Sequence, residues 1–356
     1  MRFGWRGALG IALSVALLWY AFHDIEWAKV ALAIRHANLW LLLFSAIAAT
    51  GIFPLRARRW RTILDPVAPG LPLGPLWRAT AIGMMVNNVA PARAGEPARA
   101  YALSREVEQV PFSTAFASLA VDRVFDSLIV FSLMFAAMLL PSFPTGAALS
   151  VARYAIWGVV FVAIVLVALY LIVYFPKQII SFFELFARRV APSFEARGRE
   201  ILVKFANGLS VLRSPRRFIA VLGWALLHWL LNAFAFWLGF LAVGIHASFG
   251  TALFVQGIIV IGVAIPSSPG FFGFFEAAGK FALGIYGVSE TMAVTWAVGF
   301  HVLSFIPITL IGSYYFARAG LTLTELSKAG RAESAADSGA TSERTAVSSS
   351  LKPPAA

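Results

Sequence analysis

Long apolar runs dominate the chain, and several of them are long enough to cross a lipid bilayer. The hydrocarbon core of a bilayer is about 30 Å thick, so a spanning helix needs about 20 predominantly apolar residues. About six runs meet this requirement, at residues 7–22, 39–55, 112–140, 150–175, 217–243 and 289–317. Because 60% of the residues are hydrophobic and only 13% are charged, a water-soluble domain is excluded. The sequence therefore predicts an all-α polytopic membrane protein.

Two further apolar segments, 73–110 and 249–286, are interrupted near their middles by Pro, Gly and polar residues. Lipid cannot satisfy the backbone N–H and C=O groups that such a break exposes, so the break must face a cavity, a ligand or other protein. We expect each segment to be a re-entrant hairpin of two broken helices. The simpler interpretation, a tight turn between two short helices, also requires an interior lined by protein.

A weak internal repeat relates the two broken segments. A shift of 178 residues, from 91 to 269 and from 95 to 273, places Pro91 on Pro269 and Gly95 on Gly273. Each predicted unit then contains a span, a broken hairpin and a second span, and the units are inverted relative to each other, as in many transporters. The two units cover about 39–140 and 217–317.

Lysine and arginine residues are unevenly distributed between the predicted loops, and an excess of them marks cytoplasmic loops. Both the region after the second span and the segment 176–216 are rich in them, whereas 141–150 and 244–250 have none. The first basic region contains Arg56, Arg58, Arg59, Arg61 and Arg78. This asymmetry predicts an inner (plasma) membrane protein with both ends in the cytoplasm.

The charge pattern also divides the chain into regions. We expect residues 1–320 to form the membrane domain, with 176–216 as an amphipathic cytoplasmic connection that lies on anionic lipid headgroups. A regulatory or partner-binding role for this connection is the alternative. The remaining residues, 321–356, are rich in Ala, Ser, Gly and Pro and predict a disordered cytoplasmic tail.

The first broken segment carries amide and charged side chains around its break, namely Asn87, Asn88, Arg93, Glu96 and Arg99. Ionisable residues inside membrane segments are costly, so each is a functional candidate. Arginines suit a lipid phosphate through charged hydrogen bonds, a glutamate can orient an arginine, and asparagines suit headgroup hydroxyls. The alternative is an internal Arg–Glu pair that fixes the hairpin.

The third span contains Asp122, Arg123 and Asp126, with the two aspartates four residues apart on one helical face. Three interpretations stay open: a gating network of ion pairs, a proton-coupled carboxylate, and partners that neutralise Arg93 or Arg99 from a neighbouring helix. Arg123, together with Arg59, is also a second-rank candidate for headgroup steering.

The second broken segment supplies hydroxyl groups and a carboxylate. Ser267 and Ser268 lie at the break, which prolines flank, and can serve as neutral donors; Glu276 precedes Lys280 at helical i, i+4 spacing. We interpret the nearby phenylalanines as packing residues. The histidines in the fifth and sixth spans, His228 and His301, are weaker candidates.

Several chemical classes have no motif in the sequence. Cysteine is absent, and the histidines lack metal-ligand spacing. There is no P-loop, Ser-His-Asp order or dinucleotide fingerprint. We therefore predict no cofactor, no metal and no enzymatic activity. The net charge of +12 is interpreted as membrane orientation, with no nucleic-acid partner.

As a set, RARRW at 56–60, NNVAPARAGEPARA at 87–100, AVDRVFD at 120–126 and IPSSPGFFGFFE at 265–276 resemble the lysylphosphatidylglycerol synthase transmembrane region family. This is the flippase-like domain also found in multiple peptide resistance factors. The resemblance covers nearly the whole membrane part and implies a lipid-translocating domain of a bacterial or archaeal cell membrane. It does not imply lysyl transfer, and we expect a stand-alone membrane domain without the soluble aminoacyltransferase.

The leading prediction from the sequence is a flippase for a phospholipid or lipid-linked precursor, whose polar headgroup binds between the broken hairpins. Two alternatives stay open. One is a secondary transporter of a small anionic solute, which the same architecture suits. The other is a non-catalytic membrane subunit of a lipid or glycan synthesis complex.

Overall fold

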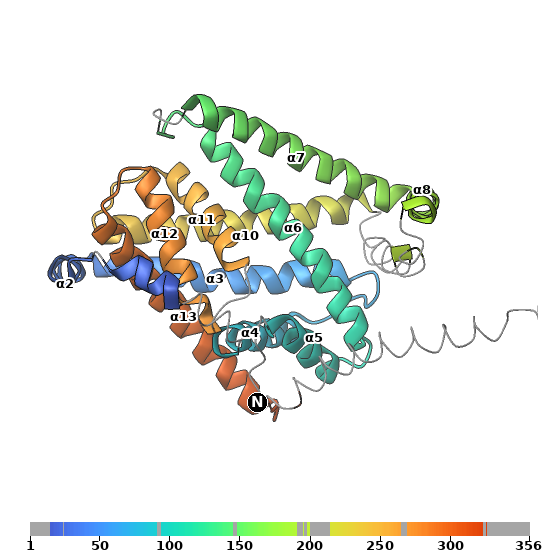
Figure 1. Ribbon diagram of the computed structural model, residues 1–356. Coiled ribbons are helices and arrows are strands. Elements are labelled where there is room, and N and C mark those ends of the chain that lie inside the picture. Colours follow the sequence, from blue (N-terminus) through green and yellow to red (C-terminus); the bar gives the residue numbers. More distant parts are fainter. Residues whose placement is uncertain are drawn as a thin grey trace, which may run out of the picture.

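The computed structural model describes residues 15–23, 25–90, 94–144, 148–190, 195, 198–199, 214–264, 269–322 and 325. All regular secondary structure in these residues is helical, which confirms the all-α prediction (Figure 1). Residues 15–22 are helical. The further α-helices are α2 (Trp27–Arg35), α3 (Leu39–Leu64), α4 (Leu73–Val89), α5 (Gly95–Glu106), α6 (Phe112–Met138), α7 (Ala148–Tyr174), α8 (Pro176–Val190), α10 (Pro215–Ala242), α11 (Phe249–Ala264), α12 (Phe274–Ile285) and α13 (Glu290–Arg318), with the 3₁₀ turn η4 (Pro269–Phe271) before α12.

Four helices in the described part of the chain are long and apolar enough to cross a membrane: α3, residues 156–174 of α7, α10 and α13. The helix α6 has a comparable length but contains three charged residues near its middle. The first predicted span, 7–22, lies partly outside the described residues. These lengths and compositions agree with a polytopic membrane protein.

The helix α3 is longer than the predicted second span, because it ends at Leu64 rather than at residue 55. The arginines assigned to a loop after that span therefore lie inside a helix, and that loop prediction is wrong. Arg56 and Arg59 are buried in the protein. The helix can continue through them because Arg59 is paired with carboxylates of α6, and Arg56 is buried 3.7 Å from one of these, so neither charge is left facing hydrocarbon.

The helices α3 and α10 pack side by side in opposite directions and form the centre of the fold (Figure 1). The backbone N–H of Asn38, just before α3, donates to the carbonyl of Ala242 at the end of α10, and Asp65 pairs with Arg217 at the other ends. Small residues allow close approach between them: the Ser45 hydroxyl donates to the Ala235 carbonyl at 2.8 Å.

Both broken segments form pairs of helices, α4 with α5 and α11 with α12 (Figure 1). In the first pair Gly83 lies against Gly95, where a Cβ on either residue would overlap the other backbone. In the second pair Gly262 lies against Ala278. The two pairs lie toward opposite ends of the α3–α10 pair.

The helix packing has the same pattern in both predicted units. The hairpin helix α4 packs on α13 of the other unit, and its counterpart α11 packs on α6. Likewise α5 packs on α6 where α12 packs on α13. Exchange of the two units therefore reproduces the pattern of helix contacts, although their inverted relation stays a prediction.

The predicted amphipathic connection begins with α8, which presents Phe182, Leu185 and Phe186 as exposed apolar side chains beside Arg188 and Arg189. This composition suits a helix that lies at a membrane surface. Most of the remainder of 176–216, and nearly all of the predicted tail 321–356, lie outside the described residues.

Candidate functional site

A cavity of about 230 Å³ lies between helices of the two predicted units. Helices of both units line it, including α3, α6, α10, α11 and α13. One part of its wall is aromatic, with Phe236, Phe271, Phe275, Phe300 and Phe305. The polar part consists of Arg56, Asn88, Arg123, Asp126, His228, Asn232, Gln256, His301 and Ser304.

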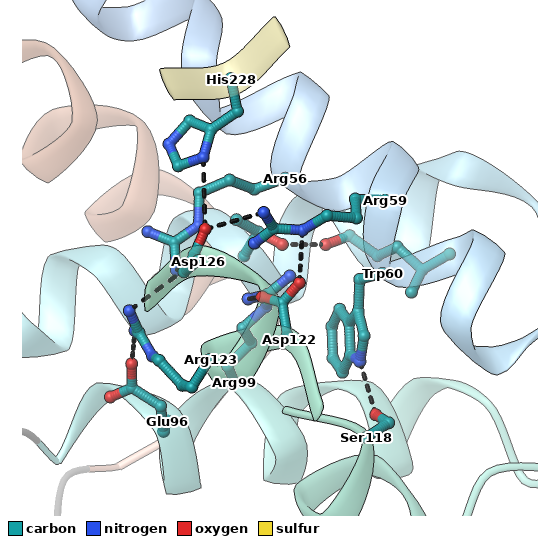
Figure 2. Close-up of polar contacts among 12 residues, drawn as sticks. Arg56, Arg59, Trp60, Glu96, Arg99, Ser118, Asp122, Arg123, Asp126 and His228 are labelled. Atoms are coloured by element: carbon teal, nitrogen blue, oxygen red, sulfur yellow. Dashed lines mark hydrogen bonds and ion pairs between the residues drawn. The ribbon is translucent and has the colours of Figure 1, made fainter. Parts of the chain in front are cut away.

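A cluster of ion pairs lies beside the polar part of this cavity (Figure 2). At its centre the Arg59 guanidinium donates to Asp122 at 2.6 Å and to Asp126 at 2.7 Å. All three side chains are nearly completely buried. Such desolvated charges are tolerated only when they are paired with good geometry, so Arg59 holds α3 against α6.

Arg99 approaches the same cluster from the first hairpin. Its guanidinium lies 4.1 Å from the centre of the Trp60 ring, and its Nη1 is 3.4 Å from Asp122. The Trp60 indole in turn donates to the Ser118 hydroxyl at 2.7 Å. Asp122 of the third span thus lies within ion-pair distance of Arg99, and these contacts attach α5 to α3 and α6.

Arg123 links the hairpin to the cavity. It forms an ion pair with Glu96 in the first turn of α5, and its Nη1 lies 3.7 Å from Asp126 (Figure 2). Among the described residues, Glu96 therefore pairs with Arg123 and not with Arg99, one of the two arginines that it was expected to orient; the other, Arg93, lies outside the described residues.

Arg56 differs from the other arginines of the cluster because no oxygen acceptor lies at hydrogen-bond distance from it. It is buried and lines the cavity, yet its Nη2 is 3.7 Å from Asp126 and its Nη1 reaches the Met84 sulfur at 3.6 Å. Its Nε has no hydrogen-bond partner among the described residues. A buried guanidinium without an oxygen acceptor at hydrogen-bond distance is costly, and a bound anion would remove that cost.

The charges of the cluster do not balance. Among the described residues four arginines meet three carboxylates, which leaves one positive charge in excess when His228 is neutral. Asp126 also accepts a hydrogen bond from the Trp229 indole at 3.0 Å and lies 3.5 Å from His228. This excess charge beside a cavity favours an anionic ligand such as a phosphate.

The two asparagines have different structural roles. Asn87 accepts a hydrogen bond from the backbone N–H of Gly95 at 2.8 Å and so closes the first hairpin. Asn88 donates to the Thr309 hydroxyl of α13 at 2.7 Å and lines the cavity. Of Asn87 and Asn88, only Asn88 is placed to contact a ligand in the cavity.

A second polar group lies where the other hairpin meets the cavity. Glu276 accepts a hydrogen bond from the Gly273 N–H at 2.7 Å and lies 2.6 Å from His301 Nδ1. The other ring nitrogen of His301 is 2.8 Å from the Gly270 carbonyl. The predicted helical neighbour Lys280 instead pairs with Glu290 at 2.7 Å.

The two hairpins thus use related contacts. Each of α5 and α12 has a glutamate in its first turn, Glu96 or Glu276. Each glutamate contacts a basic residue of the following long helix, Arg123 or His301, and these two occupy equivalent positions in the predicted repeat.

Three predicted site residues, Arg93, Ser267 and Ser268, lie outside the described residues. Of the others, Asn88, Arg123 and Asp126 line the cavity, whereas Asn87, Glu96, Arg99, Asp122 and Glu276 support its walls. Arg56, which lines the cavity, was not among the predicted site residues. No group of three potential metal ligands occurs in the part of the chain that the structure describes.

Comparison with known proteins places the chain in a family. The family described as "Lysylphosphatidylglycerol synthase TM region" matches residues 7–312. The chain is 30% identical to a UPF0104 membrane protein of Methanothermobacter thermautotrophicus over 307 residues, which cover 79% of this chain and 84% of that protein. No solved structure matches significantly.

A second relative is larger. The chain is 35% identical over 121 residues to the Glycosyltransferase AglD of Haloferax volcanii, which covers 34% of this chain and 19% of that protein. Because the family match extends over most of the chain, this membrane protein belongs to the lysylphosphatidylglycerol synthase transmembrane region family.

Proposed function

We propose that this protein is a flippase that moves the polar headgroup of a phospholipid or lipid-linked precursor across the plasma membrane. The observation that carries the proposal is Arg56, a buried arginine at the wall of the central cavity that lacks an oxygen acceptor at hydrogen-bond distance. A phosphate would accept charged hydrogen bonds from it. The family, whose description names a lysylphosphatidylglycerol synthase, supports a lipid substrate.

The composition of the cavity supports a substrate that is polar at one end and apolar at the other. Its arginine wall suits a headgroup phosphate, while its phenylalanine wall suits the adjoining apolar part of a lipid. In this proposal the two units rock against each other around the α3–α10 pair, as in inverted-repeat transporters, and expose the cavity to one side and then the other. Both chain ends lie in the cytoplasm.

The test is lipid movement in liposomes that contain the purified full chain. Fluorescent phosphatidylglycerol in the inner leaflet becomes accessible to an external membrane-impermeant quencher only after it has crossed. Arg56→Gln is expected to slow this movement by about tenfold to a hundredfold, because hydrogen bonds to a charged group contribute about 1.5–3 kcal/mol. Arg58→Gln, on the same helix but not part of the cavity lining, is the matched control and should retain the wild-type rate.

Wild-type rates in Arg56→Gln would contradict the assignment of the site. A wild-type protein that moves neither phosphatidylglycerol nor phosphatidylcholine would contradict the flippase itself. Uptake of radiolabelled inorganic phosphate by the same liposomes would then favour a transporter of small anionic solutes.

A second candidate function is a non-catalytic membrane module of a lipid or glycan synthesis complex. The partial match to the Glycosyltransferase AglD favours it, because 121 residues of this chain are similar to part of a protein that is named as an enzyme. Co-purification of a glycosyltransferase with the tagged chain, together with absence of lipid movement by the isolated protein, would select this candidate.

A further inference from the structure

An apolar groove of about 350 Å³ lies between α6 and α7, apart from the central cavity. Its apolar lining consists of Val124, Leu128 and Phe131 from α6 and Phe161 and Val165 from α7. The span in α7 has a mean hydropathy of 3.0 and is only 14% buried within the protein. A surface of this kind on a membrane-spanning helix faces the hydrocarbon of the bilayer.

Arg123 lines both this groove and the central cavity. It lies near the middle of α6, and 44% of its side chain is exposed although it pairs with Glu96 and Asp126. A guanidinium that faces hydrocarbon is costly. A lipid phosphate would cover its exposed part, since one guanidinium has five N–H donors and can bind several acceptors together.

We propose that the groove between α6 and α7 binds one hydrocarbon chain of a membrane lipid whose anionic phosphate contacts Arg123. The headgroup can then enter the central cavity beside Asp126 while the chain stays in the bilayer. This assignment rests on the proposed function, because it identifies where the same substrate enters. It also narrows the substrate to lipids with a negatively charged headgroup.

The chain contains no cysteine, so Ser127→Cys creates a single labelling site. Ser127 is exposed, lines the groove and lies one helical turn from Arg123 on the same face. A small environment-sensitive fluorophore attached there reports which lipid chains occupy the groove. The full-length labelled protein is placed in vesicles that contain either phosphatidylglycerol or phosphatidylcholine with brominated chains, and quenching by bromine is measured over a series of lipid fractions.

The expected result is about tenfold stronger apparent binding of phosphatidylglycerol than of phosphatidylcholine, because one charged contact contributes about 1.5 kcal/mol. The matched control is Leu226→Cys, whose label lies at an exposed position within α10 that is not part of the groove lining. It should show no preference. Arg123→Gln combined with Ser127→Cys should lose the preference and bind both lipids about equally.

Equal quenching by the two lipids at position 127 would overturn the proposal, as would an equally strong preference at position 226. The comparison of the two lipids leaves Arg123 unchanged, so it decides the proposal whether or not Arg123→Gln folds. The readout is binding at equilibrium and requires no lipid movement. Lipid movement without this preference would contradict only the proposed binding of lipid in the groove. The preference without lipid movement would contradict the proposed flippase function.

Discussion

The Nε of Arg59 donates to Oδ1 of Asp122 at 2.6 Å, and protein encloses both side chains almost completely. Arg59 also bonds Asp126, so one cation compensates two carboxylates of the neighbouring helix. Removal of one partner from such a group leaves a charge buried without compensation, which typically costs about 3–5 kcal/mol. The contact therefore joins α3 to α6.

We expect Arg59→Ala to destabilise the protein by about 3–5 kcal/mol, since Asp122 and Asp126 would lose their shared partner. The measurement is the apparent melting temperature of the purified protein in detergent, determined from the fraction of protein that remains monodisperse after heating. Arg58→Ala is the matched control, because Arg58 is partly exposed and its ring contact with Trp224 contributes about 0.5–1 kcal/mol. Equal melting temperatures of the two variants would show that the buried pairs do not stabilise the fold.

Arg56 is expected to behave in the opposite way. Its hydrogen bond is to the Met84 sulfur, and Asp126 keeps Arg59 and Trp229 as partners when Arg56 is removed. The free energy of unfolding of Arg56→Met should therefore be within about 1 kcal/mol of the wild-type value, or higher than it. The reason is that an apolar residue replaces a poorly compensated buried charge. Lipid movement should nevertheless fall, which separates a ligand-binding residue from a structural one. A loss of stability as large as that of Arg59→Ala would show that Arg56 is structural.

Much of the architecture is predictable from the sequence because membrane spans have a strong signal. Lipid requires about 20 apolar residues in a helix, so α7, α10 and α13 begin and end within two residues of their predicted bounds. The end of α3 was not predictable in this way. Four arginines after residue 55 indicate a loop when they are counted, and only the facing carboxylates of α6 explain why the helix continues through Arg56 and Arg59.

The site was predictable in its residue types but less so in its pairings. The polar residues around the first break identified the region, yet Asn87 proves to close the hairpin and Glu96 to pair with Arg123. These pairings depend on which helices are neighbours, which sequence spacing does not specify. One signal was available in the sequence. Arg56 and Arg59 are three residues apart and so share one face of a helix, and Asp122 and Asp126, four residues apart, also share one face.

The close approach inside the first hairpin gives a further prediction. A Cβ at Gly95 would overlap the Gly83 carbonyl and the side chain of Asn87. Gly95→Ala should therefore destabilise the protein by about 1–3 kcal/mol or more. Gly223→Ala in α10 is the control, because no atom lies within 4 Å of its added Cβ and alanine favours a helix by about 0.5–1 kcal/mol. Equal melting temperatures of Gly95→Ala and Gly223→Ala would mean that α4 and α5 separate readily.

The contacts of Glu276 define the last prediction. The Gly270 carbonyl can only accept a hydrogen bond, so Nε2 of His301 donates to it, and a proton lies between Nδ1 and Glu276. A glutamine in place of Glu276 can satisfy the same groups. Its carbonyl would accept from the Gly273 N–H while its amide donates to Nδ1 of a neutral imidazole.

We therefore expect the free energy of unfolding of Glu276→Gln to be within about 1 kcal/mol of the wild-type value. Glu276→Ala should be destabilised by about 1–3 kcal/mol for each of the two buried groups that it leaves without a partner, the Gly273 N–H and the His301 ring. Glu106→Ala is the control, since Glu106 forms an exposed pair with Arg78 that contributes at most about 1 kcal/mol. If glutamine destabilised the protein as much as alanine, the negative charge of Glu276 would be essential, and His301 would have to be a charged imidazolium in the folded protein.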